Sequence, residues 1–421
     1  MRKVFCLMFI FERVKMTTMH KTFVTTCLLN FLIAALLGLL LRYAFINDIT
    51  FNFRFLTHAH SHIAMLGWVY LMIFTLFNHY FVTNNKRFYK NLFWVTQFAV
   101  VGMLFSFPFQ GYAAASITFS TLHILCSYVF VFRIWKDMKL KNRLIENSAK
   151  WALAFMTLST FGVWCLGPAV SLMGKTSAFY QTAIQFFLHF QFNGWFLFAV
   201  IAVFFHQLQI QPSKNSKLFL RLLIFATFCS FALPLQWFAP HWSLFYINVL
   251  GWILQLIALI YFLKIIKEPY KIIVSKSQKT IRLLFVFALS CLVLKLILQG
   301  LSVVPKFAQT LINHKNFIIG FIHLMMLGVV SGFLFAFLLF SKTIKHSTSL
   351  NIGIYCFLLG FSSTELLLAY QGGLFYLGKG LLPKYHLILF VSSVFLPLGI
   401  AIILLTYLRQ KINAKQTLKT L

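Results

Sequence analysis

The sequence predicts an all-α, polytopic membrane protein with about twelve transmembrane helices, and three observations lead to this fold class. Hydrophobic residues make up 60% of the 421 residues and charged residues only 10%, a composition that does not suit a water-soluble surface. Apolar runs long enough to cross a bilayer recur along the whole chain. The alternating pattern of a β-barrel is absent, and isolated strands cannot satisfy their backbone groups in lipid. The spans are therefore expected to be helices.

One transmembrane domain is expected at residues 22–408, between cytoplasmic tails at 1–21 and 409–421. Its spans are expected at 22–46, 60–83, 91–109, 112–135, 150–173, 180–206, 217–238, 243–266, 281–303, 315–341, 350–371 and 384–408. The first tail is basic and contains a short apolar run without a small-residue cleavage site after it, so we do not interpret it as a signal peptide. Met16 and Met19 are alternative starts. The seven cysteines are scattered and predict no disulfide framework.

The net charge of +31 would suggest nucleic-acid binding in a soluble chain, but the positions of the charges indicate a membrane. The loop after the fourth span is rich in basic residues, whereas the turn between the third and fourth spans has none. These residues are Arg133, Lys136, Lys139, Lys141, Arg143 and Lys150. By the positive-inside rule both termini are cytoplasmic, in the inner (cytoplasmic) membrane, and the basic loops face anionic lipid. Nucleic acid is not an expected partner.

Three histidines crowd the start of the second span, in the segment Thr57-His58-Ala59-His60-Ser61-His62. On a helix His58 and His62 share one face, while His60 points roughly the other way. Most of the 13 histidines, His241 and His323 among them, fall in the half of the protein expected to lie outside. A neutral imidazole is the commonest metal ligand, and polar residues at membrane depth indicate a functional site. Separate interfacial or core histidines are the alternative.

The sixth span carries a polar stripe, because Gln181, Gln185, His189 and Asn193 recur every four residues. Such a stripe should point into the bundle, toward a cofactor, a water-filled cavity or polar partners on neighbouring helices. Hydrogen bonding between helices is the structural alternative. His189 is the candidate for a catalytic group or a second metal ligand on this span.

Two further charged residues lie within spans, Lys295 in the ninth and Glu365 in the eleventh. Burying either charge alone is expensive, so we expect them to pair with each other or with a cofactor carboxylate. Glu365 is also the carboxylate candidate for a proton relay, which makes it a second catalytic candidate.

At these residues the chain resembles subunit I of the haem-copper oxidase and nitric oxide reductase superfamily. The resemblance rests on twelve spans, on the histidine-led second span with Leu66-Gly67-Trp68, and on Gly320-Phe321-Ile322-His323-Leu324-Met325-Met326-Leu327-Gly328 in the tenth. NnrS-type membrane haemoproteins are similar in the same two places. The resemblance implies the bundle of that subunit and a haem held by His62, with His60 or His58 as alternates, and by His323. It further implies respiratory electron transfer, or reduction of or response to oxygen or nitric oxide, with an electron-donor protein or quinol as partner.

The chain departs from that family at the copper site. Positions 321 and 325 are Phe and Met, where a second histidine of the tenth span would stand, and the span at 217–238 contains no histidine. His189 matches the copper-ligand position by span number and depth, and His241 lies one loop later than the family's pair. The resemblance therefore implies one haem, of a type the sequence does not specify, and an incomplete copper site.

A twelve-helix secondary transporter is the alternative function. Its polar path would be lined by the sixth span, Lys295 and Glu365. The loop after the sixth span is short, and few charges lie within the membrane. We therefore favour a membrane haemoprotein that could act as an oxidoreductase over the transporter.

Overall fold

The structure is a computed structural model that describes residues 20–83, 86–274, 276–304, 307–308, 311 and 313–417. All regular elements among these residues are helices. Twelve single or composite helices are long and apolar enough to cross a membrane, and each overlaps one of the spans expected from the sequence. The protein is thus a multi-pass membrane protein with an all-α fold. The cytoplasmic placement of the termini stays a prediction, and residues 1–19 and 418–421 of the expected tails lie outside the described residues.

Nine of these spans are formed without a change of helix type, apart from the break that divides the seventh into two helices. They are α2 (Lys21–Tyr43), α5 (Lys86–Gln110), α6 (Ala114–Asp137), α7 (Arg143–Met173), α10 (Lys214–Cys229) with α11 (Ala232–Phe238), α12 (Trp242–Val274), α13 (Lys279–Leu301), α17 (Thr348–Tyr376) and α18 (Tyr385–Thr417).

The second, sixth and tenth spans are composite. Each consists of an α-helix, a π-helical segment and a second α-helix. They are α3 (Phe53–His62), η1 (Ile63–Tyr70) and α4 (Leu71–Phe81); α8 (Ala178–His189), η2 (Phe190–Phe196) and α9 (Leu197–Gln207); and α15 (Lys315–His323), η3 (Leu324–Ser331) and α16 (Gly332–Phe340).

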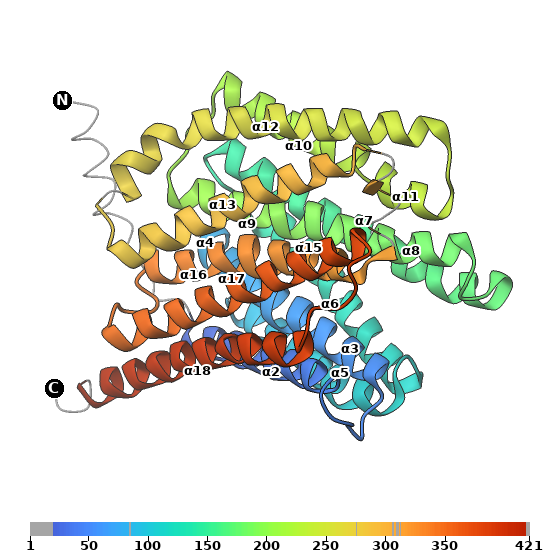
Figure 1. The fold of residues 1–421 in the computed structure, drawn as a ribbon. Helices are drawn as coiled ribbons and strands as arrows, with labels where there is room; N and C mark the ends of the chain where they lie inside the picture. Colours follow the sequence, from blue (N-terminus) through green and yellow to red (C-terminus); the bar gives the residue numbers. More distant parts are fainter. Residues whose placement is uncertain are drawn as a thin grey trace.

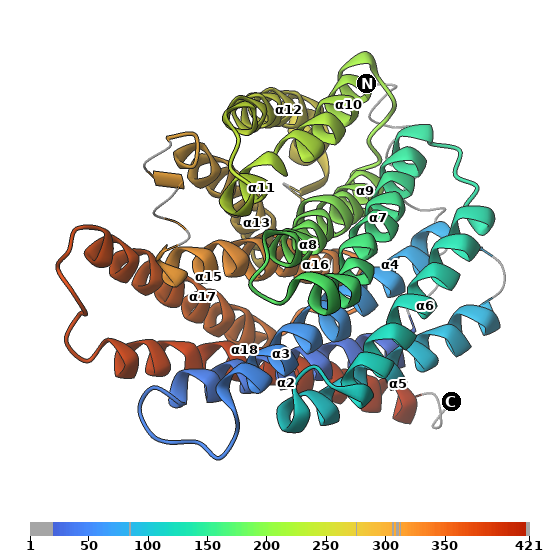
Figure 2. The same cartoon turned by 90° about the vertical axis from the view of Figure 1, so that its right-hand side faces the viewer.

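The three composite spans form the centre of the bundle. Their most apolar windows are 72%, 72% and 83% buried, whereas the other spans are no more than 50% buried. Figure 2 shows α8 and α16 near the middle and α5, α12 and α17 at the periphery. The peripheral helices expose large apolar side chains, such as Leu250, Ile253 and Ile260 on α12, as a lipid-facing surface requires. The end of the bundle at which α3, α8 and α15 begin, on the right in Figure 1, is called the histidine end below.

The chain repeats one arrangement three times, with four spans in each unit. In every unit the central span packs on the span before it, through α2 with η1, α7 with η2, and α13 with η3. The last two spans of each unit pair as α5 with α6, α10 with α12, and α17 with α18. The three units therefore meet along their central spans, where α9 contacts both α4 and α16.

A short sequence motif marks the same point in each unit. A histidine ends the first α-helix of the central span, the π-helical segment begins at the next residue, and a glycine follows the histidine by five positions. The three pairs are His62 with Gly67, His189 with Gly194, and His323 with Gly328. π-Helical segments are rare and are frequent at functional sites. The repeat was not expected from the sequence, because the positions between histidine and glycine differ from unit to unit.

The glycines let the preceding span of each unit approach closely. A Cβ atom on Gly194 would lie 2.6 Å from Cβ of Phe155 on α7. A Cβ atom on Gly328 would lie 2.8 Å from Sγ of Cys291 on α13. Any larger residue would push the two helices apart, so the motif fixes the distance between them.

Buried polar side chains donate hydrogen bonds to carbonyl oxygens of two π-helical segments. Asn30 of α2 donates from Nδ2 to the carbonyl oxygen of Gly67 at 2.8 Å, and its amide also pairs with Gln97 of α5. In η3, Ser331 Oγ donates to the carbonyl oxygen of Met326 at 2.8 Å. An unpaired buried carbonyl is costly, so these polar residues stabilise the segments.

Candidate functional site

His60 points away from the other two histidines of α3, toward α2. Its Nδ1 lies 2.8 Å from the carbonyl oxygen of Ala34, so Nδ1 carries the proton and donates it. The ring packs over Gly38, where an added Cβ would come within 2.9 Å of Cε1. Because Nδ1 is committed to a carbonyl, Nε2 carries the lone pair that a metal ion would need.

His323, at the end of α15, faces a carboxylate but makes no hydrogen bond to it. Its Nδ1 lies 3.5 Å from Oε1 of Glu365 on α17. The carboxylate has room because Gly320 stands beside its other oxygen, Oε2. Both side chains stay partly accessible, His323 at 24% and Glu365 at 17%. A carboxylate on Nδ1 orients a ligating imidazole and raises the basicity of its Nε2.

His60 and His323 lie near each other at the histidine end. Arg42 lies within electrostatic range of His60, His323 and Glu365, and His323 lies within that range of His60. Arg42 is on α2, so four spans contribute to this group, which we call the His60–His323 cluster: Arg42, His60, His323 and Glu365. It contains two imidazoles on different central spans, each with Nδ1 directed at an oxygen atom.

His62 and His58, the other candidates of the second span, lie on the opposite face of α3. His62 Nδ1 donates to the carbonyl oxygen of His58 at 2.8 Å, and its Nε2 lies 3.2 Å from the hydroxyl of Tyr112. Because Nδ1 donates to a carbonyl, Nε2 carries the lone pair and accepts the hydrogen bond from the Tyr112 hydroxyl. Phe107 packs on the His62 ring, and the ring of Tyr112 contacts His58. Both nitrogens of His62 therefore have protein partners.

His189 is also hydrogen-bonded at both ring nitrogens. Nε2 lies 2.8 Å from the carbonyl oxygen of Thr227 on α10, and Nδ1 lies 3.5 Å from Asn193 Nδ2. The expected polar stripe does point into the bundle at these two residues. Gln181, at the exposed start of α8, instead bonds the carbonyl oxygen of Lys175. The catalytic role considered for His189 stays a prediction.

His241 lies exposed in the turn before α12, where Nδ1 contacts Oγ of Ser243 at 2.8 Å. His241 is therefore not part of the group around His60 or of the group around His189. Among the described residues, no group of three or more His, Cys, Asp or Glu side chains is placed to hold a metal ion by itself. Two axial imidazoles on a haem iron would not form such a group.

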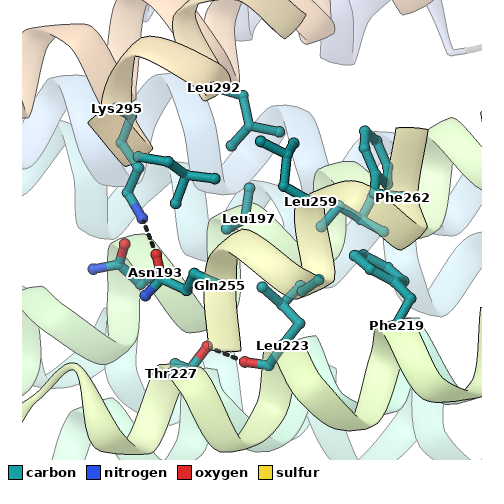
Figure 3. A pocket seen from close by; sticks show the side chains of 13 residues that line it. Asn193, Leu197, Phe219, Leu223, Thr227, Gln255, Leu259, Phe262, Leu292 and Lys295 are labelled. Carbon is teal, nitrogen blue, oxygen red and sulfur yellow. Dashed lines mark hydrogen bonds between the residues drawn. The ribbon is translucent and has the colours of Figure 1, made fainter. Parts of the chain in front are cut away.

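The expected pairing of Lys295 with Glu365 is wrong. Lys295 Nζ lies 3.5 Å from Oε1 of Gln255 on α12, while Glu365 faces His323. Both charges belong to the third unit, but Lys295 faces α12 of the second unit and Glu365 faces the tenth span, so each has a nearer neighbour. Lys295 and the sixth span do share one cavity, shown in Figure 3, but Glu365 is not among the residues that line it.

Arg42, Gly38 and Ala34 were missed by the analysis of motifs. All three lie on the first span, and their local sequence contains no motif that is typical of a functional site. A basic residue near the expected outer end of a span was the available signal, since outer segments carry few basic residues. Comparison of the chain with protein-family models and with curated proteins finds no match.

Proposed function

We propose that this protein is an integral membrane haemoprotein of the haem-copper oxidase subunit I type. In this proposal one haem lies at the histidine end between the second and tenth spans, with His60 and His323 as its axial ligands. The observation that carries it is which ring nitrogens of His60, His323 and His62 already have partners within the protein. Nδ1 of His60 is hydrogen-bonded to a carbonyl and Nδ1 of His323 lies 3.5 Å from a carboxylate oxygen, which leaves Nε2 of each for iron. Both nitrogens of His62 are instead hydrogen-bonded within the protein.

The surroundings of the two imidazoles fit a haem. Arg42 supplies a positive charge for a haem propionate, as guanidinium groups bind carboxylates well. The tenth span is strongly apolar, with a mean hydropathy of 2.3, and offers an apolar wall to the ring system. A bound haem would supply one-electron chemistry, and this chain would bind it, orient it and tune its potential.

The function that follows is electron transfer in a respiratory membrane, with a quinol or an electron-donor protein as reductant. Reduction of oxygen or nitric oxide would need an open metal position beside the haem. A copper ion ligated by His189 would have to displace the bonds to Thr227 and Asn193, so the proposal is restricted to one six-coordinate haem.

The test is a reduced-minus-oxidised difference spectrum of protein purified after expression with ample haem. We expect sharp bands of six-coordinate low-spin haem. His60→Ala and His323→Ala should abolish these bands, while His62→Ala and His241→Ala retain them.

If His62→Ala loses the bands and His60→Ala retains them, the haem ligand on the second span is His62 and not His60. Wild-type protein that stays colourless would exclude the haem proposal and favour the twelve-helix transporter.

A further inference from the structure

A cavity lies between the sixth, seventh, eighth and ninth spans and is lined by none of the residues of the His60–His323 cluster. One end is apolar, with Leu197, Phe219 and Phe262, and the other is polar, as Figure 3 shows. The polar lining consists of Asn193, Thr227, Gln255 and Lys295. About 30 Å³ of the cavity admits a water-sized sphere, which is room for one or two water-sized groups.

Lys295 reaches into the polar end and lacks a counter-ion. The residue is 1% exposed, and its ammonium group makes a single weak contact, the 3.5 Å one to Gln255 Oε1. No carboxylate among the described residues lies within ion-pair distance of Nζ. An ammonium group has three donors, so most of its hydrogen-bonding capacity is unused. A buried charge in this state is strongly unfavourable without a partner.

The neighbours of Lys295 add polar groups but no acid. His189 lies within electrostatic range of Lys295, and its ring nitrogens are bonded to Thr227 and Asn193. Asn193 borders the cavity from the same span and brings an amide group. The site therefore offers one full positive charge, amide groups and no acid, in a space too small for phosphate or for a haem carboxylate with its ring.

We propose that this cavity binds one small monovalent inorganic anion, of the size of chloride or nitrite, against the Lys295 ammonium group. The anion neutralises the lysine and accepts its unused hydrogen bonds. The apolar lining excludes larger and more strongly hydrated ions. This site is separate from the haem proposal, and its tests have no haem readout.

The first test is thermal unfolding of detergent-purified protein in gluconate, with increasing chloride, bromide or nitrite at constant ionic strength. An anion that binds only the folded state raises the unfolding midpoint, and above its Kd the midpoint keeps rising with the logarithm of the anion concentration. We expect this rise for wild type and its absence in Lys295→Met, which removes the charge and keeps a side chain of similar length. Lys384→Met, at an exposed position, is the matched control and should respond like wild type.

Lys295→Met should fold, because it replaces an unpaired buried charge by an apolar group, and its midpoint in gluconate should equal or exceed that of wild type. Equal anion responses of wild type and Lys295→Met would overturn the proposal. Bromide-soaked crystals of wild type give a second readout. An anomalous peak beside Nζ is expected, and bromide bound only elsewhere would also overturn it.

Discussion

The indole Nε1 of Trp68 donates a hydrogen bond of 2.9 Å to Oγ of Ser331, and both residues are buried. Trp68 belongs to η1 and Ser331 to η3, so this bond joins the second span to the tenth directly. The two spans carry His60 and His323, and the bond therefore sets the distance between the two sides of the candidate haem site. The hydroxyl can accept from Trp68 because its own proton goes to the carbonyl oxygen of Met326.

Trp68→Phe removes the donor and should lower the free energy of unfolding by about 1 kcal/mol. Ser331→Ala leaves the indole N–H buried without a partner and should cost about 1–3 kcal/mol. Unfolding in SDS measures both. The double variant should be less destabilised than the sum of the single ones, and strict additivity would show that the bond does not couple the two spans.

Glu365→Gln should raise the midpoint potential of the proposed haem while keeping its spectrum. Glu365 faces Nδ1 of His323, and in its ionised form it stabilises the more positive ferric state, which a neutral amide does not. Redox titration of purified protein is the measurement. Glu146→Gln, whose carboxylate pairs with Lys150 elsewhere in the bundle, is the control. An equal midpoint potential in wild type and Glu365→Gln would show that Glu365 does not tune the potential of the haem.

Gly194→Ala should destabilise the sixth span by about 1–3 kcal/mol, since its Cβ would lie 2.6 Å from Phe155. Gly373→Ala on α17 is the control, because nothing lies within 4 Å of an added Cβ there. Alanine favours a helix by about 1 kcal/mol over glycine, so the control should be neutral or more stable. Thermal unfolding that ranks the two variants in the opposite order would contradict the close packing.

Asn30→Leu should destabilise the protein, because the carbonyl oxygen of Gly67 and the amide of Gln97 both lose their partner in a buried place. The expected cost is about 1–3 kcal/mol for each group left unpaired. Adding Gln97→Leu should recover part of this loss, since one orphaned group is then removed. A double variant less stable than Asn30→Leu would show that Gln97 stabilises the bundle independently of Asn30.

The positions of the twelve spans could be predicted from the sequence because hydrophobicity over about twenty residues is a strong, local signal. The π-helical segments could not, since one extra residue per turn leaves the apolar character unchanged. What reveals them is a histidine and a glycine five residues apart in every fourth span. Recognising that pattern needs the spans to be numbered and compared first.

The candidate site was predicted only in part. A histidine cluster on the second span and His323 on the tenth were identified by sequence, and helix geometry separated His60 from its neighbours. Which imidazole faces His323 depends on Ala34, Gly38 and Arg42 of the first span, and sequence does not place that span against the others. The pairing of Lys295 with Glu365 failed for the same reason, because proximity across a bundle is a property of packing.

Each π-helical segment separates two parts of its central span that have different structural roles. The α-helix after the segment packs into the core, and the α-helix before it presents a histidine to a neighbouring helix. One extra residue between the two parts means that a deletion in Leu324–Ser331 would turn His323 by about a quarter of a circle, since successive residues of an α-helix are about 100° apart. The helix after the segment, α16, would keep its position in the core. The residues around each histidine can therefore vary while the packing of the helix after the π-helical segment stays the same. The three units differ in this way, because Tyr112 lies beside His62, Thr227 beside His189 and Glu365 beside His323.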